Sequence, residues 1–186
     1  MFGDTFPKVD DNIKGYKGGS MLENSSKRSS LANRGMKFEE QIQKQCDKYK
    51  KEGLAYIDKL PTSWKVIRKG RFISSAFPEA KSKLDFYGTL KNGESIYIEA
   101  KSSQSTSIPL ANFKEHQFVY LDELSKYTDH VYVLVEMKKY EKVFLVKGKK
   151  ILEFKNTETR KSIPYKWFTE EENATLLNGV DFLEKL

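Results

Sequence analysis

The sequence predicts an α/β protein in which helices flank a mixed central sheet. Segments with helical apolar spacing alternate along the chain with short apolar strands, in the order helix, strands, helix, strands. The dipeptide Asn92-Gly93 separates two of these strands and is the strongest hairpin signal in the chain. A length of 186 residues is enough for one domain with its own core.

The first helix is expected to begin near Asn33–Met36. Its apolar residues then follow at spacings of four, four and three, which places them on one helical face: Phe38, Ile42, Cys46 and Tyr49. Gly53 is expected to end this helix. We interpret Cys46 as a small core residue, because it lies on that face.

Residues 1–31 are predicted to be a flexible N-terminal tail, with the folded domain at 32–186. The tail holds four of the eleven glycines and many serines, and it has no periodic apolar face. Such a segment buries too little surface to offset the entropy lost on ordering.

The central hairpin is predicted from two strands, Lys83–Leu90 and Ser95–Lys101. The second strand alternates strictly, which gives an apolar face (Ile96, Ile98, Ala100) and a face with charge (Tyr97, Glu99, Lys101). The remaining elements are strands at Ala55–Ile57, Trp64–Ile67, His130–Glu136 and Lys142–Val146, and helices at about Leu110–Lys126 and Val180–Leu186.

The composition suggests an acidic partner such as nucleic acid. There are 33 Lys+Arg against 26 Asp+Glu, a formal net charge of +7. One cysteine and two histidines argue against a disulfide framework and a compact zinc centre. No run approaches the roughly 20 apolar residues of a membrane helix, and the N-terminus lacks a signal-peptide pattern. We therefore expect no membrane partner and a cytoplasmic location.

The charged face of the hairpin is the candidate for chemistry. Asp85 neighbours Glu99 and Lys101 if the two strands pair. Two adjacent carboxylates repel, and their hard oxygens suit Mg²⁺ or Mn²⁺. A lysine beside them can stabilise charge that builds on a phosphate. The alternative is a solvent-facing hairpin with a surface ion pair, which would contribute little.

This interpretation sets a geometric condition on the hairpin. A regular two-residue loop at Asn92-Gly93 would pair Asp85 with Ala100 and turn it away from Glu99. A three-residue loop, a bulge or a bend at Asp85 would bring the two carboxylates onto one face.

A series of ordered phrases resembles the RecU-type Holliday junction resolvases of the PD-(D/E)xK nuclease superfamily. The phrases cover about Ala32 to Phe154. In chain order they are Ala32-Asn33-Arg34-Gly35-Met36-Lys37-Phe38-Glu39, Lys59-Leu60-Pro61-Thr62, Asp85-Phe86-Tyr87-Gly88, Glu99-Ala100-Lys101, Ile108-Pro109-Leu110-Ala111-Asn112-Phe113 and His116-Gln117.

The resemblance implies a restriction-endonuclease-like core, with a stalk-like insertion at about 68–82 in a nuclease domain at 32–186. It implies a Mg²⁺-dependent endonuclease (Mn²⁺ possible) that resolves four-way DNA junctions by symmetric nicking in recombination and repair. It also implies a homodimer, with a recombinase or branch-migration protein as a further partner. The alternatives are a PD-(D/E)xK nuclease with another DNA target, a junction-binding protein with a weak site, and a basic domain that binds nucleic acid only electrostatically.

The resemblance also implies roles for individual residues. Asp85 and Glu99 match the metal-binding carboxylates, and Gln117 matches a further metal-site residue. Lys101 matches the lysine that stabilises the transition state, and Glu39 matches an acidic residue of the first helix near the metal. For two of these residues a non-catalytic interpretation stays open. Glu39 would then be an exposed carboxylate in the first turn of its helix, and Gln117 an amide on a helix surface.

Two departures from the family pattern affect these expectations. Lys83 stands where the family usually has a threonine of the metal site, and a charged lysine cannot donate a lone pair to a metal. The stalk-like segment is also short. Basic residues near the proposed site and stalk are candidates for phosphate contacts: Arg34, Lys59, Lys65, Arg68, Lys69, Arg71, Lys81 and Lys83.

Overall fold

The computed structural model describes residues 20–61, 64–78 and 83–186. The chain divides into two units, Met1–Ala32 and Asn33–Leu186. In the first unit the described residues belong to the helix that begins at Ser20. The second unit contains the sheet and the candidate site.

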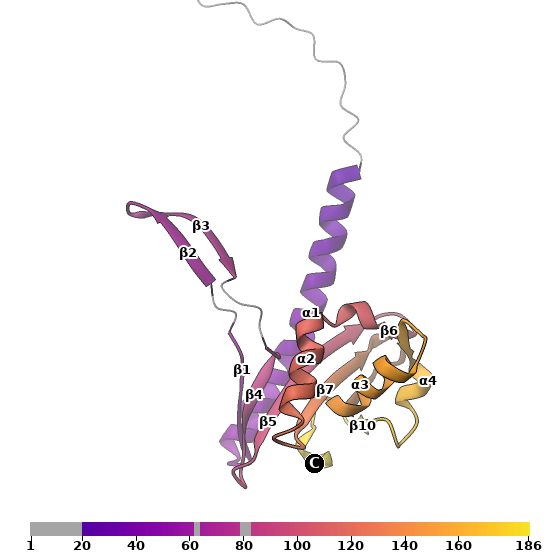
Figure 1. Cartoon of the computed structure of the whole chain (residues 1–186). Helices are drawn as coiled ribbons and strands as arrows, with labels where there is room; N and C mark the ends of the chain where they lie inside the picture. Colours follow the sequence, from indigo (N-terminus) through magenta and orange to yellow (C-terminus); the bar gives the residue numbers. More distant parts are fainter. Residues whose placement is uncertain (1–19, 62–63, 79–82) are drawn as a thin grey trace, which may run out of the picture. The chain divides into compact units, whose positions relative to one another are not determined.

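A six-stranded sheet forms the centre of the second unit, in the order β1-β4-β5-β7-β8-β10 (Figure 1). Only β5 and β7 run parallel, so the sheet is mixed but mostly antiparallel. This confirms the predicted mixed sheet flanked by helices. The strands are Ala55–Lys59 (β1), Phe86–Leu90 (β4), Ser95–Ser103 (β5), Val131–Met137 (β7), Lys142–Lys147 (β8) and Thr175–Leu177 (β10).

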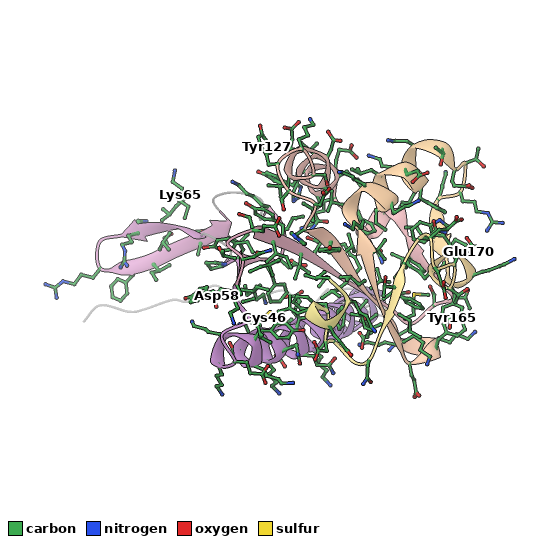
Figure 2. All side chains as sticks on the ribbon, turned by 90° about the horizontal axis from the view of Figure 1, so that it is seen from below. Cys46, Asp58, Lys65, Tyr127, Tyr165 and Glu170 are labelled. Atoms are coloured by element: carbon green, nitrogen blue, oxygen red, sulfur yellow. The ribbon has the colours of Figure 1, made fainter. Side chains whose placement is uncertain are left out.

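The part of helix α1 (Ser20–Lys51) that belongs to the second unit covers one face of the sheet, and α2 (Glu115–Leu124) and α3 (Gly148–Thr157) cover the other (Figure 1). The predicted apolar face of α1 is confirmed, because Phe38, Ile42, Cys46 and Tyr49 are all buried in one cluster with β1, β4 and β5. Cys46 lies on the inner side of α1 (Figure 2). Burial raises the pKa of its thiol to about 12, as expected for a core residue.

Helix α1 begins at Ser20, earlier than the start expected near Asn33–Met36. Residues 20–34 contain neither glycine nor proline, the two residue types that are least favourable inside a helix. Apolar spacing marks only the part that packs. Residues 1–19 lie outside the described residues, and the flexible tail stays a prediction.

The β4–β5 hairpin has a three-residue loop at Lys91, Asn92 and Gly93. The Leu90 N–H donates to the Glu94 carbonyl at 2.8 Å, and Gly93 has a φ of 90°, a conformation that favours glycine. In the resulting register Phe86 pairs with Ile98, and one step further Asp85 comes opposite Glu99. Asp85 also lies at a bend before β4. The geometric condition for a shared face is therefore met.

Gly88 allows β1 to approach β4 closely. A Cβ on Gly88 would collide with the Tyr56 carbonyl oxygen and would lie 2.6 Å from the Ile57 Cα. No other residue type fits this position without moving the backbone. The approach fixes the strand that ends beside the candidate site.

A second hairpin forms a separate two-stranded sheet from β2 (Trp64–Lys69) and β3 (Phe72–Pro78). Its register shifts between Ile67 and Arg68, and Gly70 turns the tip with a φ of 63°. The stalk-like segment was predicted at about 68–82, whereas the hairpin occupies Trp64–Pro78. The hairpin therefore begins and ends about four residues before the predicted stalk-like segment.

The C-terminal part differs most from expectation. The helix expected at about Leu110–Lys126 is broken at Phe113, whose backbone is extended, and continues as α2. Helix α3 follows β8 directly, and the expected C-terminal helix shortens to one 3₁₀ turn. The remaining elements are β6 (Ser107–Pro109), β9 (Ser162–Pro164), α4 (Tyr165–Phe168) and 3₁₀ turns at Leu110–Asn112, Lys138–Tyr140 and Leu183–Lys185.

Among the described helices, none combines the length and apolar character needed to cross a membrane.

Candidate active site

Asp85 is held by the strands on both sides of it. Its Oδ2 accepts the Ala100 N–H of β5 at 2.8 Å, and its backbone carbonyl accepts the Leu60 N–H, just after β1, at 2.8 Å. Burial raises the pKa of Asp85, and the negative charge of Glu39 adds to the rise. The Ala100 N–H and the charge of Lys101 oppose the rise. A half-buried carboxylate with a raised pKa is therefore fixed just before β4.

Glu99 is fully buried on β5, with 0% of its surface exposed. Its Oε1 accepts hydrogen bonds from Lys101 Nζ at 2.5 Å and from Gln117 Nε2 at 2.6 Å. Its Oε2 is buried with no hydrogen-bond partner in the described part of the chain. Burial, followed by the charge of Asp85, raises the pKa of Glu99 to about 8. A buried acceptor oxygen without a donor is costly unless another positive group satisfies it.

Lys101 lies beside Glu99 on the same side of β5, as the alternation predicted. Its side chain is only 12% exposed. Besides the bond to Glu99, Nζ donates to Gln117 Oε1 at 3.2 Å and lies 5.1 Å from the centroid of the Phe113 ring. These contacts hold a cationic group in a largely dry position, where its charge acts strongly.

Gln117 joins this cluster from the first turn of α2. It is 7% exposed, so it is not a surface amide. Its Oε1 also accepts the Lys114 N–H at 3.0 Å, which caps the start of the helix. The break before α2 thus places the first turn of the helix over β5.

Glu39 lies near this cluster without joining its hydrogen bonds. Its carboxylate pairs with Lys59 Nζ at 2.7 Å, and its charge contributes to the raised pKa of Asp85. It is not a first-turn carboxylate, because α1 begins at Ser20. The described residues contain no group of three or more Asp, Glu, His or Cys side chains that could hold a metal. Two carboxylates are therefore the core of the site.

The donor chemistry of the two carboxylates fits a hard divalent cation. Asp85 and Glu99 face each other across the hairpin, and the buried Glu99 Oε2 accepts no hydrogen bond among the described residues. Mg²⁺ characteristically binds through one or two carboxylates together with water and substrate phosphate. A cation here would also offset the burial that raises both carboxyl pKa values, together with the negative charge of Asp85 that adds to the rise at Glu99.

The candidate DNA-binding residues fall into different surroundings. Lys59 ends β1 in its ion pair with Glu39. Lys65, Arg68, Lys69 and Arg71 are exposed on the β2–β3 hairpin, where Lys65 is labelled in Figure 2. Arg34 belongs to α1 but its side chain is not described, and Lys81 lies outside the described residues. Lys83 is exposed, with Nζ 5.8 Å from the Tyr120 ring centroid.

Comparison with known proteins identifies the family. A family model described as "Recombination protein U" matches residues 33–185. The chain belongs to the RecU family. A protein of Pediococcus pentosaceus named "Holliday junction resolvase RecU" is 32% identical over 148 residues, covering 74% of this chain and 73% of the relative. Proteins of the same name from Bacillus thuringiensis and Bacillus cereus are 29% identical over 147 residues, with the same coverage of 74% and 73%.

The RecU match covers the whole candidate site, from Glu39 on α1 to Gln117 on α2. Sequence reasoning alone missed three contacts within it. The Ala100 N–H that holds Asp85 is a backbone group, and only the strand register reveals it. The Glu39–Lys59 pair and the Lys114 cap join distant or irregular segments. The phrase Glu99-Ala100-Lys101 marks the position of the amide without showing its partner.

Proposed function

We propose that this RecU-family protein is a Mg²⁺-dependent endonuclease that resolves four-way DNA junctions by symmetric nicking in recombination and repair. The observation that carries the proposal is the pair of carboxylates, half-buried Asp85 and buried Glu99, beside Lys101. The RecU relatives that bear the name Holliday junction resolvase support the substrate. We assign the β4–β5 hairpin to a PD-(D/E)xK core on the same grounds.

Asp85 and Glu99 would hold the metal, which we propose to be Mg²⁺ with Mn²⁺ as a substitute. When bound, a divalent cation supplies Lewis-acid charge at the attacked phosphate and favours deprotonation of water. Lys101 would place its ammonium at the phosphate oxygen on which negative charge builds. Asp85, fixed by the Ala100 N–H, would orient the attacking water. Glu39 would add negative charge at the rim of the site and orient Lys59 through their ion pair.

Affinity for DNA is proposed to come from exposed basic groups outside the catalytic pair. Lys65, Arg68, Lys69 and Arg71 are on the β2–β3 hairpin, which would act as the stalk. Arg34, Lys59, Lys81 and Lys83 are proposed to contact phosphates nearer the site. Such contacts supply affinity that depends on salt but not on base sequence.

A homodimer is proposed, because a four-way junction has near-twofold symmetry and two equivalent sites would cut it symmetrically. A recombinase or a branch-migration protein is a further proposed partner. We keep the domain division of a tail at 1–31 and a nuclease domain at 32–186 as part of the proposal. The cytoplasm is the proposed location, since the DNA of the bacterial relatives lies there.

The test compares wild type with Asp85→Ala on a labelled four-way junction and a matched duplex. We expect paired symmetric nicks on the junction alone, with Mg²⁺ or Mn²⁺ but not with EDTA. Because Asp85→Ala removes one of the two carboxylates, cleavage should fall by about a hundredfold or more while junction binding persists. Equal cleavage of the duplex would favour another DNA target, and tight junction binding without cleavage would favour a binding protein.

A further inference from the structure

We propose that a groove at the end of β4 away from the candidate site docks a basic segment of a partner protein, in which an apolar side chain is flanked by lysine or arginine. The groove lies between the last turn of α1, the turn that joins β4 and β5, and the C-terminal 3₁₀ turn at Leu183–Lys185. The inference goes beyond the proposed nuclease function and does not depend on it, because the residues that line the groove include none of the candidate site.

Four leucine side chains line the groove. Its volume of about 510 Å³ lies within the range of about 300–1,000 Å³ that is typical of ligand pockets. Leu54 and Leu186 each expose 41% of their surface. The other two are Leu90 and Leu183. Exposed apolar surface that is concave and surrounded by polar groups is typical of a site of interaction.

Hydrogen bonds hold the walls of the groove in place. The hydroxyl oxygen of Tyr49, on α1, accepts the Phe182 N–H at 2.9 Å and the Leu183 N–H at 3.2 Å. On the other side, the Lys91 N–H donates to the Leu54 carbonyl at 3.0 Å, which ties the β4–β5 turn to the start of β1. The groove is therefore formed before a ligand enters, and less ordering has to accompany binding.

The rim of the groove has a charge opposite to that of the whole chain. Three carboxylates line it, from Glu52, Asp181 and Glu184, against one lysine, Lys91. The chain as a whole has a formal net charge of +7. Carboxylates repel DNA phosphates and attract lysine and arginine, so the rim favours a basic partner over a nucleic acid. An apolar groove with an acidic rim thus fits an amphipathic basic segment.

The groove and the candidate site lie at opposite ends of β4. Asp85 directly precedes the first residue of the strand, whereas Leu90 is the last residue and lines the groove. Five residues at about 3.4 Å each separate the two ends by about 17 Å. Figure 1 shows the C-terminus at the same end of the sheet as the β4–β5 turn. A segment in the groove would therefore leave the carboxylates of the site open to DNA.

The first experiment selects ligands from a phage-displayed peptide library on the immobilised full chain, without DNA or metal. We expect the enriched peptides to combine an apolar residue with flanking lysine or arginine. The same peptides, synthesised with a fluorescent label, should bind in anisotropy titrations. An empty selection, or enrichment of acidic or purely polar peptides, would overturn the proposal.

A pair of matched variants then locates the binding. The groove variant combines Leu54→Arg with Glu184→Lys. The control combines Leu176→Arg with Glu158→Lys, which makes the same changes at exposed positions outside the groove. Peptide affinity should fall by about tenfold or more in the groove variant and stay at the wild-type value in the control. Equal affinities of wild type and the groove variant would place the peptide elsewhere and overturn the proposal.

A milder variant, Glu52→Gln with Glu184→Gln, tests the charge of the rim and keeps the size of both side chains. Peptide affinity should decrease several-fold and should depend less on salt, because two negative groups are lost. An unchanged salt dependence would contradict the role of the acidic rim. This variant also decides the question if thermal unfolding shows that the groove variant is not folded.

Two further measurements test other occupants of the groove. If sedimentation shows that the groove variant dissociates an oligomer that the control keeps, the occupant is a second copy of this chain and the proposal fails. Junction binding and cleavage should be the same in the groove variant as in wild type, and a loss would assign the groove to DNA. Failure of the nuclease proposal would look different, because wild type would then bind the peptides but cut no junction.

Discussion

The two hairpins of the second unit have opposite physical characters. The β4–β5 hairpin lies in the middle of a six-stranded sheet, covered by helices, and holds the buried Glu99 opposite the half-buried Asp85. The β2–β3 hairpin is a sheet of its own, and its described side chains are exposed, including Phe72 at 79% and the basic Arg68 and Lys69. Both hairpins belong to the same chain, yet only the first has a core beneath it.

The contrast teaches that the groups proposed for catalysis and the groups proposed for DNA binding lie in different surroundings, the first largely buried and the second exposed to solvent. Burial raises the pKa values of Glu99 and Asp85, so a bound cation would stabilise the charged form of both carboxylates. An exposed lysine or arginine remains hydrated and is well suited to reversible contacts with phosphate. Three predictions test this division.

The largest expected effect comes from a matched pair of glycine substitutions. Gly88→Ala should lower the free energy of unfolding by about 3 kcal/mol or more, because its Cβ would collide with the β1 backbone. Gly70→Ala, at the tip of the exposed hairpin, meets no atom within 4 Å and strains only the local turn. It should cost no more than about 1–2 kcal/mol. Urea unfolding of both variants measures the difference, and equal losses would show that the two hairpins are equally integrated.

A smaller effect is expected from the triple substitution Arg68→Ala, Lys69→Ala and Arg71→Ala. Junction affinity should fall by about tenfold, and the slope of log affinity against log salt should decrease by up to about 0.9 for each lost contact. Mn²⁺ affinity should not change, because none of the three groups touches the carboxylates. Binding titrations at several salt concentrations check this prediction. A reduced Mn²⁺ affinity would argue against the separation of the hairpins.

The third prediction is a pH dependence of stability in the metal-free protein. The folded protein keeps a proton on Glu99 up to about pH 8, whereas the unfolded chain loses it near the ordinary carboxyl value of 4.5. The folded state thus binds more protons between these values, so stability should fall as pH rises from about 5 to 8. The raised pKa of Asp85 acts in the same direction.

Thermal unfolding in EDTA at several pH values measures the slope. We expect the melting temperature to fall by several degrees more in wild type than in Glu99→Gln, which has no proton to lose. Added Mn²⁺ should restore stability at pH 8. Parallel slopes for wild type and Glu99→Gln would contradict the assignment of the titration to Glu99.

Much of the fold was predictable because local patterns and packing agree. The apolar face of α1 and the alternation of β5 both correspond to buried residues. At residues 20–34, which lack a periodic apolar face in the sequence, the pattern placed the helix boundary too late. The break at Phe113 was unpredictable for a different reason, because Phe113 is buried in a cluster with residues of β7 and β8 that are distant in the sequence.

The sequence by itself determined which residues share a face. Glu99 and Lys101 lie two apart on a strand, and strand geometry leaves them no other choice. Whether Asp85 joins them was decided by the tertiary structure, through a three-residue loop and a bend that bring it opposite Glu99. Gln117 joins only because α2 restarts after Phe113 and is packed over β5. The spacing of residues along one strand is set by local backbone geometry. The pairing of strands and the burial of side chains depend on every element that packs around the site.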